Sequence, residues 1–376
     1  MIVSALNFLL VLVFYLLIVV IGLYATRELN ATVSQAGLVV GVFIVGALVG
    51  RLIIGQLLDR IGRKRSMLIG LFLSIVTSLL YFIDAGIGFL IFNRFLHGIA
   101  IGIASTAIAT VVAYLLPLER KGEGIGYFSL STTVATAIGP FIGFAMIQYT
   151  EFNMILAVCN TFTVAAFLVG LSLQVPELEE EQRVAARVPL SLGRLLERKV
   201  VPICTINLLI GVYYSGVLSY INAYASEQNL LDAAGFFFLA YSFAVLVSRP
   251  FAGRLLDRRG ANIVMYPAFA IMTLGLLVLS QADTGSMLLL AGGLLGLGFG
   301  NLQSCAQALA LKLVEHQRMG QATTTFYIFV DAGLGFGPYL LGFIIPYSGY
   351  ANLYLLLAAL TLATTGIYYL LHGRKA

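Results

Sequence analysis

One carboxylate, Asp331, lies inside the apolar string FVDAGLGFGP, where several small residues surround it. Ionisable side chains are rare in apolar stretches of this kind, because an unpaired charge in hydrocarbon is costly. Burial favours the protonated form of a carboxyl group, so Asp331 is a candidate for binding and releasing a proton. The alternative role is a permanently ionised partner of a buried arginine. We predict proton binding.

Two further ionisable residues, Arg94 and His97, are three positions apart in the string RFLHGIAIG. On a helix this spacing places both side chains on one face. A buried arginine can anchor an anionic group of a substrate or tune a proton-binding acid. Histidine titrates near neutral pH, which makes His97 a candidate proton relay. The alternative for His97 is a packing residue whose polar atoms are satisfied.

A charged hairpin occurs twice, as GQLLDRIGRKRS (55–66) and as GRLLDRRGANIV (253–264), 198 positions apart. A carboxylate at the end of one helix can pair locally and can also face the positive N-terminus of another helix. If the hairpin served only to keep this loop in the cytoplasm, it would need Lys and Arg but would need neither the aspartate nor the glycines. We therefore predict a conformational latch in each half of the chain. Its residues are Gly55, Asp59, Arg60, Gly62, Arg63, Lys64, Arg51, Arg249, Asp257 and Arg258.

Long apolar stretches must position these groups. The chain has 376 residues, of which 60% are hydrophobic and 10% charged, and its mean hydropathy is +0.97. A soluble protein of this length needs far more polar surface. In lipid, helices of about 20 residues satisfy every backbone polar group, and the alternating strands of a barrel are absent from the sequence. We predict an all-α membrane protein with twelve transmembrane helices, near 3–26, 35–58, 66–84, 88–115, 124–148, 152–174, 200–223, 232–256, 261–280, 286–311, 320–345 and 350–371.

The cations follow the predicted topology. Of the 22 Lys and Arg residues, 17 fall in the hairpins after even-numbered spans, in the central polar stretch or in the C-terminal tail. This asymmetry predicts that both termini are cytoplasmic in a multi-pass protein of the inner (plasma) membrane. The net charge of +5 therefore reflects topology, and no nucleic-acid partner is expected.

The offset of 198 also relates other positions of the two halves. We predict a six-helix bundle over 1–174, a cytoplasmic linker over 175–199 and a second bundle over 200–376. Duplicated helical bundles in a membrane protein are typical of transporters whose site lies near the midplane between the repeats. Asp331 corresponds to Thr133, so the acid is specific to the second half. Matched pairs include Gly98 with Gly296, Gly102 with Gly300, Gly122 with Gly320, Tyr15 with Tyr213, and Gly139-Pro140 with Gly337-Pro338.

The hairpin GQLLDRIGRKR resembles the G-x-L-a-D-R-x-G-R-K pattern of the major facilitator superfamily. RFLHGIAIG is similar to that family's helix-4 pattern R-x-x-Q-G-x-x-x-G, with His97 in place of the usual glutamine. AIGPFIG resembles the helix-5 G-P-x-x-G motif of proton-coupled exporters, through Gly139, Pro140 and Gly143. The second copy at Gly337 and Pro338 departs from the usual pattern, in which one half carries the motif.

The resemblance implies two six-helix bundles related by a pseudo-twofold axis, as in the twelve-helix drug:proton antiporters. It also implies that Asp59 meets the start of helix 11, at 320–323, and that Asp257 meets the start of helix 5 near Gly122. The substrate cavity would lie between helices 1, 4, 7 and 10. The polar and aromatic candidates on these helices are Tyr15, Asn207, Tyr213, Tyr214, Asn222, Asn301, Gln303 and Gln307.

The sequence contains no Walker A motif, metal-spaced His/Cys cluster or nucleophile elbow, so we expect neither an enzyme nor a cofactor or metal. Uphill transport would then use an ion gradient. We predict a monomeric, proton-coupled exporter of a small organic or amphipathic compound: a drug, a metabolite or a metal-chelating compound. The alternatives are a proton-coupled importer of a small metabolite or sugar, a non-transporting membrane receptor and, least favoured, a membrane-embedded enzyme.

Overall fold

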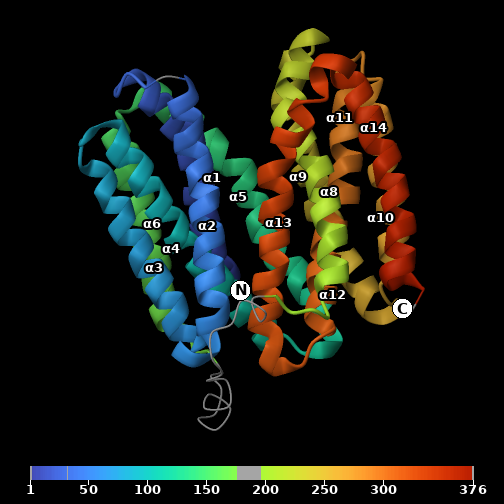
Figure 1. Ribbon diagram of the computed structural model, residues 1–376, viewed down its shortest axis with the longest axis horizontal. Helices are drawn as coiled ribbons and strands as arrows, with labels where there is room; N and C mark the ends of the chain where they lie inside the picture. The colour runs from blue at the N-terminus through green and yellow to red at the C-terminus, as the bar shows by residue number, and fades with distance from the viewer. Residues whose placement is uncertain (1, 32, 176–195, 375–376) are drawn as a thin grey trace. The chain divides into compact units, whose positions relative to one another are not determined.

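The computed structural model describes residues 2–31, 33–175 and 196–374, and every long element in these ranges is a helix (Figure 1). The predicted linker over 175–199 falls mostly outside the described residues. The helices are α1 (Ile2–Arg27), α2 (Val33–Ile61), α3 (Arg63–Leu79), α4 (Gly86–Leu115), α5 (Lys121–Tyr149), α6 (Phe152–Ser172), α8 (Val201–Glu227), α9 (Leu231–Arg259), α10 (Asn262–Ser280), α11 (Gly285–Leu295), α12 (Asn301–Lys312), α13 (Met319–Gly342) and α14 (Ile345–Tyr368).

The all-helical prediction is confirmed, and the helix ends differ from the predicted spans by a few residues. Among the described residues, 10 helical segments are long and apolar enough to cross a membrane. Two long helices lie outside this set: α5, of which several side chains fall outside the described residues, and α13, whose Gly, Thr and Asp331 lower its hydropathy. The count of twelve spans and the cytoplasmic termini therefore remain predictions.

One predicted span contains an irregular turn. The stretch predicted as a helix over 286–311 consists of α11, a π-helical turn at Gly296–Gly300 and α12. π-Turns are rare and often occur at functional sites. The glycines of GLGFG allow this turn to lie against α9, because a Cβ on Gly296 would meet the carbonyl oxygen of Tyr241.

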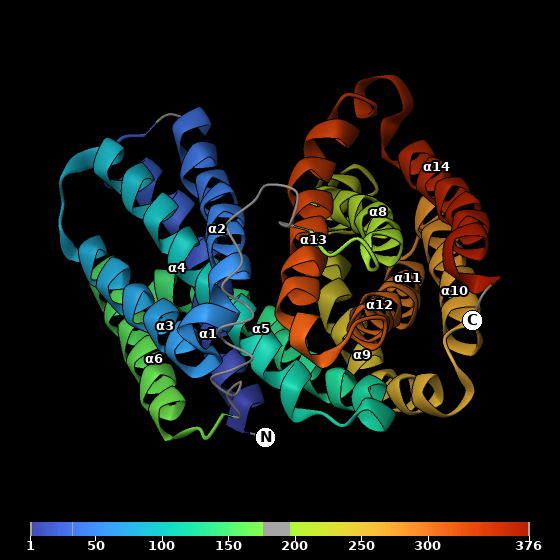
Figure 2. The same cartoon turned by 60° about the horizontal axis from the view of Figure 1, so that its bottom comes forward.

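The chain packs as two compact units. Unit 1 contains Met1–Leu115, Val134–Glu197 and His316–Tyr327. Unit 2 contains the rest, including Leu116–Thr133, a segment that contains the first part of α5. α5 and α13 are thus each shared between the units, whereas the predicted halves 1–174 and 200–376 assign each helix to one half only. The two-bundle division remains a prediction about the repeat. Figure 2 shows α2 beside α4 in unit 1, and α11 beside α9 in unit 2.

Glycines set the close approach of α2 and α4, which share the most extensive helix contact of unit 1. A Cβ on any of four glycines would collide with a carbonyl oxygen of the facing helix. Small residues spaced four apart allow this close packing in membranes. The pairs of glycine and opposing carbonyl are Gly46 with Phe95, Gly50 with Ile99, Gly98 with Phe43, and Gly102 with Ala47.

We expect the variant Gly98→Ala to lower the midpoint of thermal unfolding by several degrees, because overpacking a tight contact costs about 1–3 kcal/mol. Gly88→Ala is the matched control on the same helix, since nothing lies within 4 Å of a Cβ at that position. The gain in helix propensity is the same in both variants. Equal midpoints for the two variants, measured by dye-based thermal unfolding in detergent, would contradict this account of the α2–α4 contact.

Candidate functional site

Both charged hairpins turn at a glycine with a positive φ angle. Gly62 has φ 99° and Gly260 has φ 85°, in the left-handed region where a Cβ is strained. The N–H of each glycine donates to the carbonyl four residues earlier, Leu58 at 3.0 Å and Leu256 at 3.2 Å. The final glycine of the repeated frame therefore ends the preceding helix, and each aspartate lies on the last helical turn.

In unit 2, Asp257 binds the first turn of α5. Its Oδ1 accepts a hydrogen bond from the Gly122 N–H and its Oδ2 one from the Glu123 N–H, each at 2.8 Å. The Nζ of Lys312, at the end of α12, lies 2.6 Å from Oδ1. The carboxylate compensates free N–H groups and the positive end of the helix dipole. The contact implied near Gly122 is present, whereas Lys312 was not among the predicted latch residues.

A second carboxylate extends this cluster. Glu123 pairs with Arg254 of α9 and with Arg120, each at 2.7 Å. The hydrogen bonds from Arg254 and Arg120 hold the pKa of Glu123 below its ordinary value. This network of ion pairs was not predicted from the sequence. The signal was the spacing of three residues between Arg120 and Glu123, which is common for ion pairs.

Arg249 contacts two other segments of unit 2. Its Nε and Nη2 donate to the Gly300 carbonyl, at 3.2 and 3.1 Å, where the π-turn ends. Its Nη1 donates to the Ser129 carbonyl at 2.7 Å and to the Thr133 hydroxyl at 2.9 Å, both on α5. The buried guanidinium therefore joins α9, the π-turn and the first half of α5.

In unit 1, the first hairpin meets the beginning of α13. The guanidinium of Arg51 lies 4.6 Å from the ring centre of Tyr327, and a Cβ on Gly55 would collide with the side chain of Thr324. These contacts fall one and four residues beyond the implied 320–323 segment. The side chain of Asp59 lies outside the described part of the structure, so its contact with this segment remains a prediction.

The other cations of the hairpins contact various partners. Arg63 stacks on Tyr114, with 3.1 Å between the guanidinium carbon and the ring centre. Lys64 donates to the Leu171 carbonyl at 2.9 Å, so it caps the end of α6. Two arginines directly follow the aspartates: half-buried Arg60 and exposed Arg258.

Arg94 is completely buried in unit 1. Its Nε donates to the Val39 carbonyl at 3.1 Å and its Nη1 to the Tyr81 hydroxyl at 3.4 Å. The guanidinium carbon lies 4.5 Å from the ring centre of Phe43, a cation–π contact. In the described ranges, no carboxylate pairs with Arg94, and its Nη2 has no hydrogen-bond partner. Among the residues that the structure describes, this buried charge therefore has no counter-ion.

His97 and Arg94 both contact the hydroxyl group of Tyr81. The Nδ1 of His97 lies 3.0 Å from the Tyr81 hydroxyl oxygen, and its buried Nε2 has no hydrogen-bond partner among the described residues. Because Arg94 donates to the Tyr81 oxygen, the hydroxyl hydrogen is free to be donated to Nδ1. We therefore assign the imidazole proton to Nε2. Tyr81 was not predicted as a site residue, because it lies far from Arg94 in sequence and its type is common near membrane interfaces.

Asp331 lies near the middle of α13, 12 residues after Met319 and 11 before Gly342. It is half-buried. Glycines occur at every second position over the next two turns, from Gly333 to Gly337, and a Cβ on Gly333 would press on the Leu208 carbonyl of α8. The position on the helix agrees with the sequence, and the role of the carboxylate remains a prediction.

The glycines of the two G-P motifs serve close packing. In α5, a Cβ on Gly139 would meet Tyr15, and one on Gly143 would meet the Leu16 carbonyl, both on α1. In α13, a Cβ on Gly337 would collide with Ser215 of α8. The carbonyl of Pro338 accepts a hydrogen bond from Tyr220 at 2.6 Å. The side chain of Pro140 lies outside the described residues.

An aromatic stack occupies unit 2 between α8, α9 and the π-turn. The ring of Tyr214 stacks on Phe299 with 4.0 Å between ring centres, and on Tyr241 with 5.3 Å. Tyr213 lies in a different environment, because its hydroxyl bonds the Thr364 hydroxyl of α14 at 3.0 Å. Of the two predicted tyrosines of α8, Tyr214 alone joins this stack. Its partners Phe299 and Tyr241 were not predicted.

The remaining cavity candidates lie in several environments. Asn301 is buried and donates to the Ser248 hydroxyl at 2.9 Å and to the Leu297 carbonyl at 2.8 Å. Asn207 is buried, and its Oδ1 has no hydrogen-bond partner in the described structure. The other four positions are half-buried Tyr15 and Gln303, buried Gln307 and exposed Asn222.

Metal-ligating side chains are dispersed. Across the described ranges, no group of three or more His, Cys, Asp or Glu residues could hold a metal ion. The three cysteines, Cys159, Cys204 and Cys305, are free thiols in buried positions. Their environment suits small apolar packing residues.

Comparison with known proteins defines the family. The family model of the Major Facilitator Superfamily matches residues 3–233 and 230–375. An uncharacterized MFS-type transporter of Methanocaldococcus jannaschii is 26% identical, over 93% of this chain and 92% of its own length. The multi-drug resistance efflux pump PmrA of Streptococcus pneumoniae is 25% identical, over 81% of this chain and 77% of its own. The crystal structure of the human organic anion transporter MFSD10 has a TM-score of 0.78 at 14% identity, covering 97% of both chains. The chain therefore belongs to the major facilitator superfamily, and it is a multi-pass membrane transporter rather than an enzyme.

Proposed function

We propose that this transporter exports a small organic, amphipathic compound and takes up protons in exchange. Its similarity to a multi-drug resistance efflux pump over most of both chains supports the outward direction. The exported compound is a drug, a metabolite or a metal-chelating compound.

The observation that supports proton coupling is the buried environment of the Arg94 guanidinium. A guanidinium that is 0% exposed within an apolar helix bundle, and has no carboxylate partner in the described residues, is an expensive arrangement. A negative charge from a deprotonated acid or from the substrate would relieve it. Binding of the substrate and release of the proton would then compete, or alternate, at one positive group. This competition is the simplest physical basis for exchange.

The aromatic stack supports the substrate class. Tyr214, Phe299 and Tyr241 present flat, apolar surfaces with hydroxyl groups, a combination that suits amphipathic ring systems. The π-turn that carries Phe299 departs from regular helix, as turns at functional sites often do. A polyanion or a sugar would require more charged or hydrogen-bonding side chains.

Proteoliposomes with opposed pH gradients test the direction of exchange. The probes are ethidium, norfloxacin and fluorescein, which are cationic, zwitterionic and anionic. We expect an acidic lumen to drive accumulation of at least one probe, because protons leaving the lumen exchange for probe entering it. Protein-free liposomes correct for passive distribution.

Accumulation driven by an acidic exterior would instead show cotransport and identify an importer. Accumulation that is independent of either gradient would show that the transporter is not coupled to protons. Either result would contradict the proposal.

A further inference from the structure

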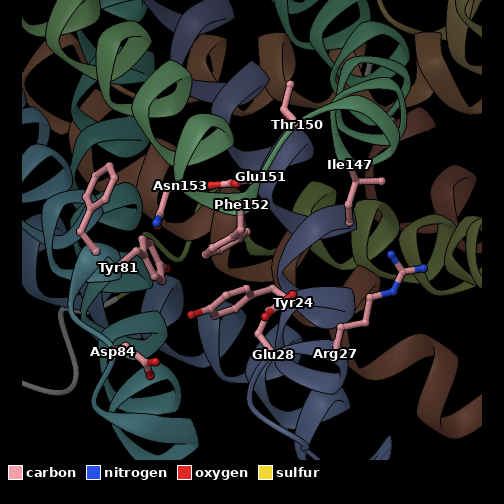
Figure 3. A pocket seen from close by; sticks show the side chains of 11 residues that line it. Tyr24, Arg27, Glu28, Tyr81, Asp84, Ile147, Thr150, Glu151, Phe152 and Asn153 are labelled. Carbon is pink, nitrogen blue, oxygen red and sulfur yellow. The ribbon is translucent and has the colours of Figure 1, made fainter.

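Unit 1 contains a pocket of about 530 Å³ between the ends of α1 and α5, the beginning of α6 and the segment after α3. This end of the unit is predicted to face the outside of the cell, because α1 ends here and its beginning is predicted to be cytoplasmic. Figure 3 shows Tyr24, Phe152 and Tyr81 gathered around it. The rings of Tyr24 and Phe152 stack, with 3.6 Å between their centres, and brace α1 against α6.

The pocket is negatively charged. Its lining includes the carboxylates of Glu28, Asp84 and Glu151 and one cation, Arg27. In the described ranges no ion pair joins these four groups, and Figure 3 shows the guanidinium of Arg27 extending away from Asp84. Unneutralised carboxylates in a concave surface raise the local concentration of cations, including hydronium.

The innermost polar group of the lining belongs to Tyr81. This residue is 5% exposed and also contacts the buried pair, because its hydroxyl bonds His97 and accepts from Arg94. A water-accessible pocket and a completely buried imidazole are therefore separated by one phenol side chain.

A smaller cavity adjoins the pocket and shares Tyr24, Tyr81 and Asp84 with it. Its volume of about 10 Å³ is close to the minimum that one water molecule needs. Asn93 lines this cavity, is 0% exposed, and has an Oδ1 without a hydrogen-bond partner. An unsatisfied buried oxygen at this place indicates a site for water. Hydration thus extends from the pocket towards the interior of unit 1.

We propose that this pocket is a proton-uptake site, and that Tyr81 and His97 relay protons from it into the interior of unit 1. Tyr81 donates its hydroxyl proton to Nδ1 of His97 and recovers one from a hydronium ion in the pocket. The proton on Nε2 leaves to water on the other side of the ring. One proton has then moved inward, and a flip of the neutral imidazole turns the new Nδ1–H inward and brings the unprotonated Nε2 to face the Tyr81 hydroxyl, ready for the next proton. This role rests on the proposed proton exchange.

The neighbours of His97 suit a relay more than a storage site. Arg94 of the same helix favours the neutral imidazole, because two adjacent cations repel. Tyr81 is the second titratable group, and the buried thiol of Cys159 of α6 belongs to the same packed cluster. From α2 the neighbour is Phe43, whose ring is edge-on to the imidazole and does not titrate.

The test compares Tyr81→Phe with Tyr224→Phe in proteoliposomes that contain the pH indicator pyranine. Tyr224 is a matched control, since it is also buried and its hydroxyl donates to a backbone carbonyl, that of Ala282, at 3.2 Å. The probe is whichever of ethidium, norfloxacin or fluorescein the wild type moves. We expect Tyr81→Phe to reduce probe-driven proton flux about 100-fold, because a positioned proton-transfer group is lost. Probe counterflow without a pH gradient should stay within about twofold of the wild type in both variants.

A second variant, Glu28→Gln/Asp84→Asn/Glu151→Gln, tests the pocket itself. Removing these charges should shift the pH profile of transport to lower external pH, because fewer protons gather in the pocket. Wild-type proton flux in Tyr81→Phe, or an unshifted profile in the triple variant, would overturn the relay and leave proton exchange intact. Absence of probe-driven proton flux in the wild type would overturn proton exchange itself, and the relay with it.

Discussion

Replacing Asp331 with asparagine should abolish transport driven by a pH gradient while leaving substrate exchange intact. Asparagine has nearly the shape of a protonated aspartic acid, so the variant should behave as a transporter whose proton is permanently bound. Counterflow of labelled probe requires binding and alternation but no net proton movement, and we expect it near the wild-type rate. Accumulation against a gradient requires deprotonation, and we expect it to fall by about 100-fold or more.

The packing around Asp331 and a conservative variant distinguish proton binding from a structural role of the carboxylate. Gly333 lies against the Leu208 backbone of α8, so the carboxylate is carried by a closely packed helix rather than a mobile loop. Asp331→Glu retains a titratable group and should recover part of the accumulation. If Asp331 were only the permanently ionised partner of an arginine, asparagine would reduce counterflow and thermal stability together. Gradient-driven accumulation by Asp331→Asn at the wild-type rate would contradict proton binding at this position.

Replacing Asp257 with alanine should slow turnover about tenfold or more, because a state that loses 1.4 kcal/mol of stabilisation loses tenfold in population. The side chain accepts two backbone hydrogen bonds from α5 and pairs with Lys312. Hydrogen bonds to charged groups contribute about 1.5–3 kcal/mol each. α5 begins in unit 2 and ends in unit 1, so its first turn is a point where one carboxylate can bias the whole transport cycle. The half-saturating probe concentration should change little.

Graded variants separate the latch from general destabilisation. Lys312→Gln removes the ion pair but retains both backbone hydrogen bonds, so its turnover should be intermediate. Asp283→Asn, an exposed carboxamide substitution in the same unit, should have the wild-type rate. Thermal unfolding in detergent reports whether each variant is folded. A folded Asp257→Ala protein with wild-type turnover in proteoliposomes would exclude the latch in unit 2.

Asp59 provides the corresponding expectation for the first hairpin. Asp59 matches Asp257 in the repeat, and its hairpin contacts α13 through Arg51 and Gly55. We therefore expect replacement of Asp59 to slow turnover and to leave substrate affinity largely unchanged. The two hairpins need not contribute equally, because the second carries fewer cations than the first.

Hydropathy and the repeat were sufficient to locate the helices and the turns between them. The predicted span over 152–174 corresponds to Phe152–Ser172, and the final glycine of each hairpin has the positive φ that such a turn requires. These features are local, since a membrane requires continuous helix and a tight turn requires glycine wherever it occurs. The irregular turn at Gly296–Gly300 was missed, because its composition is compatible with an ordinary helix.

The sequence by itself therefore determined the helical membrane architecture, the duplicated hairpins and the types of ionisable group that lie within spans. Only the tertiary structure decided which groups meet: Lys312 with Asp257, Tyr81 with both Arg94 and His97, and Tyr214 with Phe299 and Tyr241. The physical reason is the difference in range. Transfer into lipid depends on each residue and its neighbours along the chain, whereas an ion pair or a stack depends on how helices distant in sequence pack.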